Sequence, residues 1–236
     1  MRQPNNEGEV MKAWHFLRKD RKLRYGDGRL VKTGQTLTVD CKPVLCESGL
    51  HASVRPMDAL LRAAGPVICR VEVGGQVVEG EGEIVGTERH AIWMAKATNT
   101  LHLFACWCAE EALKSAKVED DCCWNAIKTK HRWIQKDATD DELDAAWDAA
   151  WNSTWDASRA AAWAAARSAA WEYELDAARD AAWDAAWAIA WADRTAVRTS
   201  ERIAIRDAAW EKQNAQLEAM REGLEGTQIS WENEDG

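Results

Sequence analysis

The sequence lacks several features that would assign a protein to a broad class. Among its 236 residues no apolar run approaches the roughly 20 residues that a bilayer-spanning helix needs, so we expect no transmembrane segment. Residues 1–10 lack the apolar core of a secretory signal, and we expect them to be a disordered extension. We therefore expect a cytoplasmic protein, and Met11 is a second candidate for the start of translation.

The seven cysteines show no recognisable disulfide framework, because their number is odd and their spacing is irregular. Zinc sites use short fixed spacings such as C-x2-C, which the pairs Cys106/Cys108 and Cys122/Cys123 do not supply. The histidines form no metal-like i, i+4 pair either. We therefore expect free, buried thiols in a reducing compartment, and no bound metal.

Negative charge is concentrated in the second half of the chain. The net charge is −9 overall, and residues 141–196 carry a net −7, whereas residues 1–86 carry a net +2. Nucleic-acid backbones and anionic lipid surfaces repel such an acidic segment. We therefore expect no membrane partner, and we do not expect a nucleic acid.

Glycine and proline are absent from residues 87–222, although all four prolines and eleven of the fourteen glycines lie at or before Gly86. These residues mark turns and strand ends, so we expect the chain to divide near residue 86. The patterns of the first part predict strands at residues 11–17, 36–39, 67–73, 77–78 and 84–85, and a short helix at 58–64. The predicted fold class is α+β, a small strand-rich domain followed by an all-helical region.

The second part is expected to be helical, starting with a helix from about residue 88 to 116. Thr139-Asp140-Asp141-Glu142 fits a capping box, in which the Thr hydroxyl and the Glu carboxylate each bind an exposed backbone N–H. The expected organisation after the N-terminal extension is an α+β domain over residues 11–117, a linking helix in 118–138, an Ala/Trp-rich helical region over 139–222 and an acidic tail over 223–236.

Residues 141–196 repeat a tetrad of the form Ala-Ala-Trp-Asp, often with Arg in place of Trp and Ala in place of Asp. Alanine is the best helix former, and the other residues at these intervals do not interrupt a helix. Eight tryptophans occupy the third position of these tetrads, and we call them the tryptophan ladder: Trp147, Trp151, Trp155, Trp163, Trp171, Trp183, Trp187 and Trp191.

The four-residue period determines where the ladder points. An α-helix turns about 100° per residue, so each step of four overshoots a full turn by about 40° and the row winds around a long helix. The segment therefore either breaks into short helices that bundle, or stays one long helix that partners wrap. We expect the indoles to be covered in either case, within the chain or by self-association, because each buries on the order of 200 Å².

Three motifs in the first part resemble an uncharacterised domain family of phage and bacterial proteins. They are Lys12-Ala13-Trp14-His15-Phe16, Tyr25-Gly26-Asp27-Gly28-Arg29 and Cys46-Glu47-Ser48-Gly49-Leu50-His51-Ala52-Ser53. The resemblance covers roughly residues 11–112, and members of the family often carry Ala/Trp/Arg-rich helical tails. It implies a phage or prophage accessory protein, acting in the host cytoplasm, and it supplies no reaction.

The first part has a strand bearing the polar His15, a Gly-containing strand with His51, then a short helix, a Val-rich strand and a later Glu. This order is similar to the ADP-ribosyltransferase fold, which implies a nucleotide pocket with NAD as cofactor. The similarity implies that His15 holds the nicotinamide ribose, that His51 takes the place usually filled by Tyr, and that Ser53 buttresses the pocket. Glu83 or Glu88 would be the catalytic acid. Residue chemistry alone favours simpler roles, with His51 bonded to backbone and His15 packed within a strand.

A basic cluster follows the first predicted strand and comprises Arg18, Lys19, Arg21, Lys22 and Arg24. Such a cluster binds phosphates or is simply solvated at a hairpin tip, and we favour solvation. The function that the sequence predicts is non-enzymatic binding or scaffolding, with self-association through the tryptophan ladder. The alternative is an ADP-ribosyltransferase-like or nucleotide-binding domain that acts on a host factor or a signalling nucleotide.

Overall fold

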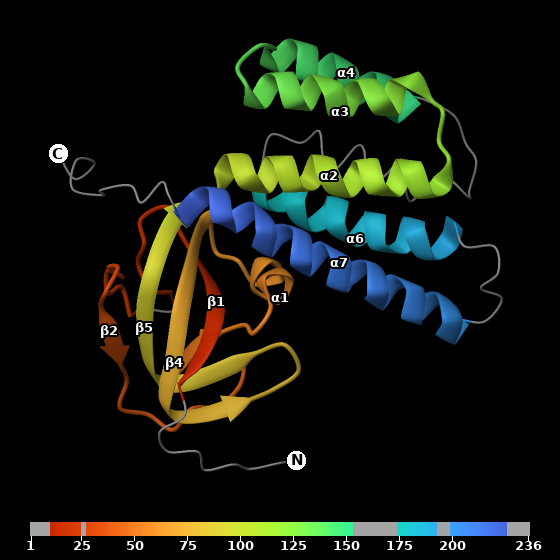
Figure 1. The fold of residues 1–236 in the computed structure, drawn as a ribbon. Coiled ribbons are helices and arrows are strands. Elements are labelled where there is room, and N and C mark those ends of the chain that lie inside the picture. The colour runs from red at the N-terminus through yellow and green to blue at the C-terminus, as the bar shows by residue number, and fades with distance from the viewer. Residues whose placement is uncertain (1–9, 25–26, 153–173, 193–198, 226–236) are drawn as a thin grey trace. The chain divides into compact units, whose positions relative to one another are not determined.

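The computed structural model describes residues 10–24, 27–152, 174–192 and 199–225, in which an antiparallel sheet of five strands precedes a set of helices (Figure 1). The fold class is therefore α+β, as expected. The chain divides into two compact units. The sheet unit comprises Met1–Ala97 together with the residues from Glu218 onward, and the helical unit comprises Thr98–Leu217.

The sheet has the strand order β1-β4-β5-β2, and β3 also pairs with β5. The strands are β1 (Met11–Leu17), β2 (Thr36–Thr38), β3 (Leu50–Ala52), β4 (Val67–Glu79) and β5 (Ile84–Lys96), and all pairings are antiparallel. Alternate residues of β4, from Val67 to Val73, join one apolar core together with Leu37 and Met94. The short helix α1 (Pro56–Leu61) begins at a proline, whose fixed φ suits the first helical turn.

Strand β5 is the main departure from the sequence prediction. The absence of glycine and proline after Gly86 suggested a helix from residue 88, but β5 continues to Lys96 and the first long helix begins at Thr98. Tertiary pairing explains the difference, because β5 lies between β4 and β2 and bonds to a strand on each side. The units accordingly separate after Ala97, neither near Gly86 nor after residue 117.

The second part contains five helices within the described residues, and the choice between one long helix and several over residues 141–196 falls partly outside those residues. The helices are α2 (Thr98–Ala116), α3 (Asp121–Ile134), α4 (Asp140–Asn152), α6 (Glu174–Ala192) and α7 (Thr199–Glu225). The predicted capping box is confirmed, because Glu142 N donates to Thr139 Oγ1 at 3.2 Å and Thr139 N donates to Glu142 Oε2 at 2.8 Å. Helix α7 continues to Glu225, past the predicted start of the acidic tail.

Helices α2 and α6 bury small side chains in the helical unit. The buried alanines include Ala105, Ala109 and Ala112 of α2, and Ala177, Ala178, Ala181, Ala182, Ala185 and Ala186 of α6. Methyl groups allow two helix backbones to approach closely, because no long side chain separates them. Among the helices of the described ranges, none combines the length and the apolar character that a bilayer span requires.

Candidate functional site

The tryptophans of α6 lie largely outside its packed face. Trp183 and Trp191 remain 48% and 51% exposed, whereas the four alanines between them are all buried. Packing within the chain therefore leaves these two indoles about half exposed, and the expectation that the indoles are covered within the chain or by self-association stays a prediction. The reason is steric, because each tetrad supplies two alanines that fit a close helix interface and one indole that does not.

Helix α7 lies against the ladder in an antiparallel register that repeats every four residues. Three pairs of side chains face each other: Trp183 with Trp210, Trp187 with Arg206, and Trp191 with Arg202. The first pair meets edge to face with ring centroids 6.3 Å apart, and the guanidinium carbons of the other two lie 5.2 and 3.9 Å from the ring centroids. Arginine over an indole face is a cation–π contact, so α7 partly covers the ladder with complementary residues.

The remaining ladder residues divide into one packed residue and four that the structure does not place. Trp147 of α4 is partly buried and packs on the core formed by Ala126, Leu143 and Ala150, as does Trp133 of α3. The side chain of Trp151, and all of Trp155, Trp163 and Trp171, lie outside the described residues.

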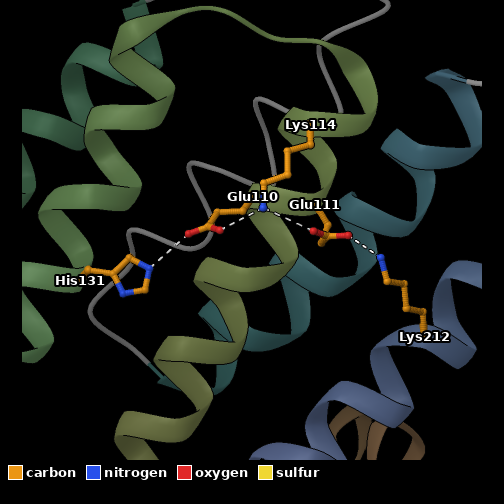
Figure 2. A network of polar contacts seen from close by, with 5 residues as sticks. All are labelled: Glu110, Glu111, Lys114, His131 and Lys212. Atoms are coloured by element: carbon orange, nitrogen blue, oxygen red, sulfur yellow. Dashed lines mark hydrogen bonds and ion pairs between the residues drawn. The ribbon is translucent and has the colours of Figure 1, made fainter.

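A charged network joins α2, α3 and α7 within the helical unit (Figure 2). Lys114 lies 3.3 Å from Glu110 and 3.5 Å from Glu111, and His131 lies 3.4 Å from Glu110. Lys212 of α7 donates to Glu111, and this bond is the main reason that the pKa of Glu111 lies below its ordinary value. The groups are partly exposed, so the network orients the three helices more than it stabilises them.

A buried polar group lies between α2 and α3. The ring of His102 meets Trp133 edge to face at 5.2 Å, and the ammonium of the buried Lys130 lies 3.8 Å from the centroid of that indole. Burial, followed by the positive charge of Lys130, lowers the pKa of His102 to about 3. The imidazole is therefore neutral at physiological pH and acts as a packing group.

In the sheet unit, the structure brings together two of the predicted site residues, His51 and Glu83. His51 Nε2 lies 3.9 Å from Glu83 Oε1, and the thiol of Cys46 donates to Glu83 Oε2 at 3.2 Å. Glu83 is only 7% exposed, so its carboxylate depends on these two neighbours. The hydrogen bond to Glu83 is also the main reason that the pKa of Cys46 lies above its ordinary value, which keeps the thiol protonated.

Arg89 is a residue of this region that sequence reasoning missed. It lies on β5, paired with Val73 of β4 and Leu37 of β2, and it is only 4% exposed. Its Nη1 donates to the backbone carbonyl of His51 at 2.6 Å. The strand register could have identified Arg89, because Val73 faces the core and the residue paired with it on the next strand must face the core as well. The incorrect helix prediction concealed that signal.

His15 of β1 lies within electrostatic reach of the same groups. Burial is the first reason that its pKa lies well below the ordinary value of 6.5, and the positive charge of Arg89 is the second. The charges of His51 and Arg24 act in the same direction. His15 is therefore neutral at pH 7.

The other predicted site residues lie outside this cluster, or form backbone hydrogen bonds elsewhere in the sheet unit. Ser53 is buried and its backbone exchanges two hydrogen bonds with Trp14, of 2.7 and 2.8 Å. Glu88 is exposed on β5, next to the buried Arg89. In the basic cluster, Arg18 is exposed and pairs with Asp20 at 3.6 Å, whereas Arg21 is buried. Solvation therefore describes Arg18 but not Arg21.

The cysteines match the expectation only in part. Cys69, Cys106, Cys108 and Cys123 are buried, but Cys41 and Cys46 are exposed. Among the residues that the structure describes, no group of three His, Cys, Asp or Glu side chains has a metal-binding arrangement. Burial raises the pKa of Cys69 to about 12, so this thiol is neutral despite the nearby Arg89.

Comparison with known proteins does not extend these assignments. No family model matches the chain, and neither does a curated protein or a solved structure. The resemblance to a phage and bacterial domain family and the similarity to ADP-ribosyltransferases, with NAD as cofactor, therefore stay predictions.

Proposed function

We propose that this protein is a non-enzymatic binding and scaffolding protein whose helical unit associates with a second copy of itself through the tryptophan ladder. The observation that supports the proposal is the exposure of Trp183 and Trp191 to about half of their surface. Exposed indoles one or two turns apart on one helix form a hydrophobic strip, and such strips mark interaction surfaces.

A second copy is the partner that this surface fits best. The contact of α6 with α7 pairs an indole with an arginine or another indole every four residues, and the tetrads repeat the same residue types at the same spacing. Two copies therefore carry matching rows of indole and guanidinium groups, which suit a symmetric interface. The net charge of −7 on residues 141–196 disfavours a nucleic acid or an anionic membrane at this surface.

Light scattering of the purified full chain at micromolar concentration tests the proposal. We expect a dimer or larger assembly that the double substitution Trp183→Ala and Trp191→Ala converts to a monomer. The matched control is Leu61→Ala, which removes a 43% exposed apolar side chain from the sheet unit. A monomeric wild-type protein, or an assembly that resists the double substitution, would contradict self-association through the ladder.

A further inference from the structure

We propose that the sheet unit binds a phosphate group at Arg89, with His15 and His51 beside it. We call this group of residues the Arg89 site. The inference is independent of assembly through the helical unit, because all three residues belong to the sheet unit.

The first observation is that Arg89 is buried with half of its hydrogen-bonding fork unused. Its Nη1 binds the His51 carbonyl at 2.6 Å, whereas its buried Nη2 has no hydrogen-bond partner among the described residues. Within the same residues Arg89 forms no ion pair. A buried guanidinium remains charged, and leaving it without a counter-ion is unfavourable.

The second observation is that the acidic groups nearby are already engaged. Asp27 lies within electrostatic reach of Arg89, but Arg29 binds both of its oxygens at 2.7 Å. The carboxylate of Glu83 accepts a hydrogen bond from the Cys46 thiol and faces His51. In the described residues no carboxylate therefore forms an ion pair with Arg89. Burial lowers the pKa of Arg89 to about 10.

The third observation concerns the kind of anion that these groups favour. The positive charges of Arg89 and Arg24 both act on His15, and a neutral imidazole there supplies one N–H donor. Positive groups around one point match a dianion better than a single carboxylate does. Guanidinium also binds phosphate oxygens with strong, charge-assisted hydrogen bonds. A phosphate group is therefore the expected ligand, either as free phosphate or as part of a phosphorylated metabolite.

Access to the site requires a side chain to move, because Nη2 of Arg89 is closed off from solvent. The ring of His51 is 29% exposed, and its closest charged partner, Glu83, lies at 3.9 Å, which is too long for a hydrogen bond. We therefore expect the His51 ring to turn aside when the anion enters.

Histidine NMR signals of the full chain provide the test. Inorganic phosphate replaces chloride at neutral pH and constant ionic strength, which removes general screening effects. We expect the signals of His15 and His51 to shift saturably, with a dissociation constant on the order of 1 mM or lower, while those of His102 and His131 do not move. The bound anion should also raise the pKa of His15, because it favours the imidazolium.

Two substitutions locate the binding group. Arg89→Gln should abolish the saturable shifts, whereas Arg18→Gln, the matched control at an exposed arginine of the same unit, should leave them unchanged. The absence of saturable shifts in the wild type at phosphate on the order of 10 mM overturns the proposal, as does their loss in Arg18→Gln alone. The wild-type titration keeps the proposal testable even when Arg89→Gln does not fold.

Titrations with ribose 5-phosphate and with adenosine monophosphate distinguish the source of the phosphate. Binding at least about tenfold tighter than inorganic phosphate, a gain of 1.4 kcal/mol, identifies a phosphorylated metabolite as the ligand. Equal or weaker binding identifies free phosphate. Both results support the Arg89 site, and failure of all three compounds contradicts it.

Discussion

The two units differ in which unfavourable groups they contain: the sheet unit buries charged groups, and the helical unit exposes apolar ones. The sheet unit buries the guanidinium of Arg89 and the carboxylate of Glu83, whereas the helical unit leaves the indoles of Trp183 and Trp191 half exposed. A buried charge and an exposed indole both cost free energy in an isolated chain. In the described residues each unit therefore contains a group that its own fold leaves uncompensated: Arg89 has no ion pair, and Trp183 and Trp191 keep about half of their surface exposed.

The packed face of α6 provides the largest expected effect, because its alanines rather than its tryptophans form the core. We expect Ala181→Leu to lower the free energy of unfolding by about 1–3 kcal/mol, since the added carbons overpack a fully buried site. Trp191→Ala should cost about 1 kcal/mol or less, because that indole is already half exposed. Urea unfolding of both variants measures the difference, and a larger loss for Trp191→Ala would reverse our assignment of the two faces.

Local signals in the sequence predicted those parts of the fold that depend on neighbouring residues. The capping box at Thr139 formed as expected, because its two hydrogen bonds join residues three positions apart. The strand at Met11–Leu17 was also predicted within its observed bounds. Neither prediction required knowledge of distant parts of the chain.

The incorrect predictions involve partners that are distant in the sequence. The register that places Arg89 opposite Val73 is a tertiary pairing, and no local pattern marks residues 88–96 as strand. The packed face of α6 could not be predicted for a related reason, because the four-residue period of the ladder fits either an indole core or an alanine core. The choice depends on the small residues of α2. His15, His51 and Glu83 were predicted from a resemblance, whereas Arg89 and Cys46 required the structure.

The pH dependence of stability tests how the helical unit buries a histidine. The folded pKa of His102, about 3, lies below the unfolded value of 6.5, so the unfolded chain binds the proton more readily. Stability is therefore complete above the unfolded pKa and decreases as the pH falls below it. From about pH 7 to about pH 5 the loss from His102 is about 2 kcal/mol.

Urea unfolding at the two pH values measures this loss in the wild type and in His102→Gln. The substitution removes the titrating group, so we expect its destabilisation relative to the wild type to shrink or reverse at the lower pH. His131→Gln is the matched control, since that imidazole is exposed to more than a third of its side-chain surface. An equal pH dependence in the wild type and His102→Gln would contradict a neutral, buried His102.

The reactivity of Cys46 tests whether the buried carboxylate of the sheet unit controls its neighbours. Glu83→Gln removes the carboxylate whose hydrogen bond, and then its negative charge, raise the pKa of Cys46, so the thiolate fraction at neutral pH should increase. We expect alkylation of Cys46 by iodoacetamide to become severalfold faster, as measured by peptide mass spectrometry. Cys41, which is also exposed, is the internal control. An unchanged ratio of the two rates would show that Glu83 does not set this pKa.

The smallest expected effect concerns the pair of Trp191 and Arg202, which either form a cation–π interaction or only lie close together on a solvated surface. If the contact at 3.9 Å is a cation–π interaction, a double-mutant cycle with Trp191→Phe and Arg202→Gln should give a coupling of about 0.5–1 kcal/mol. Simple proximity on a solvated surface gives a coupling near zero. The experiment should be run at a concentration where the protein is monomeric, because a partner copy would add contacts to the same indole. A coupling that appears only in the assembled protein would assign the pairing to the interface between copies rather than to the contact between α6 and α7.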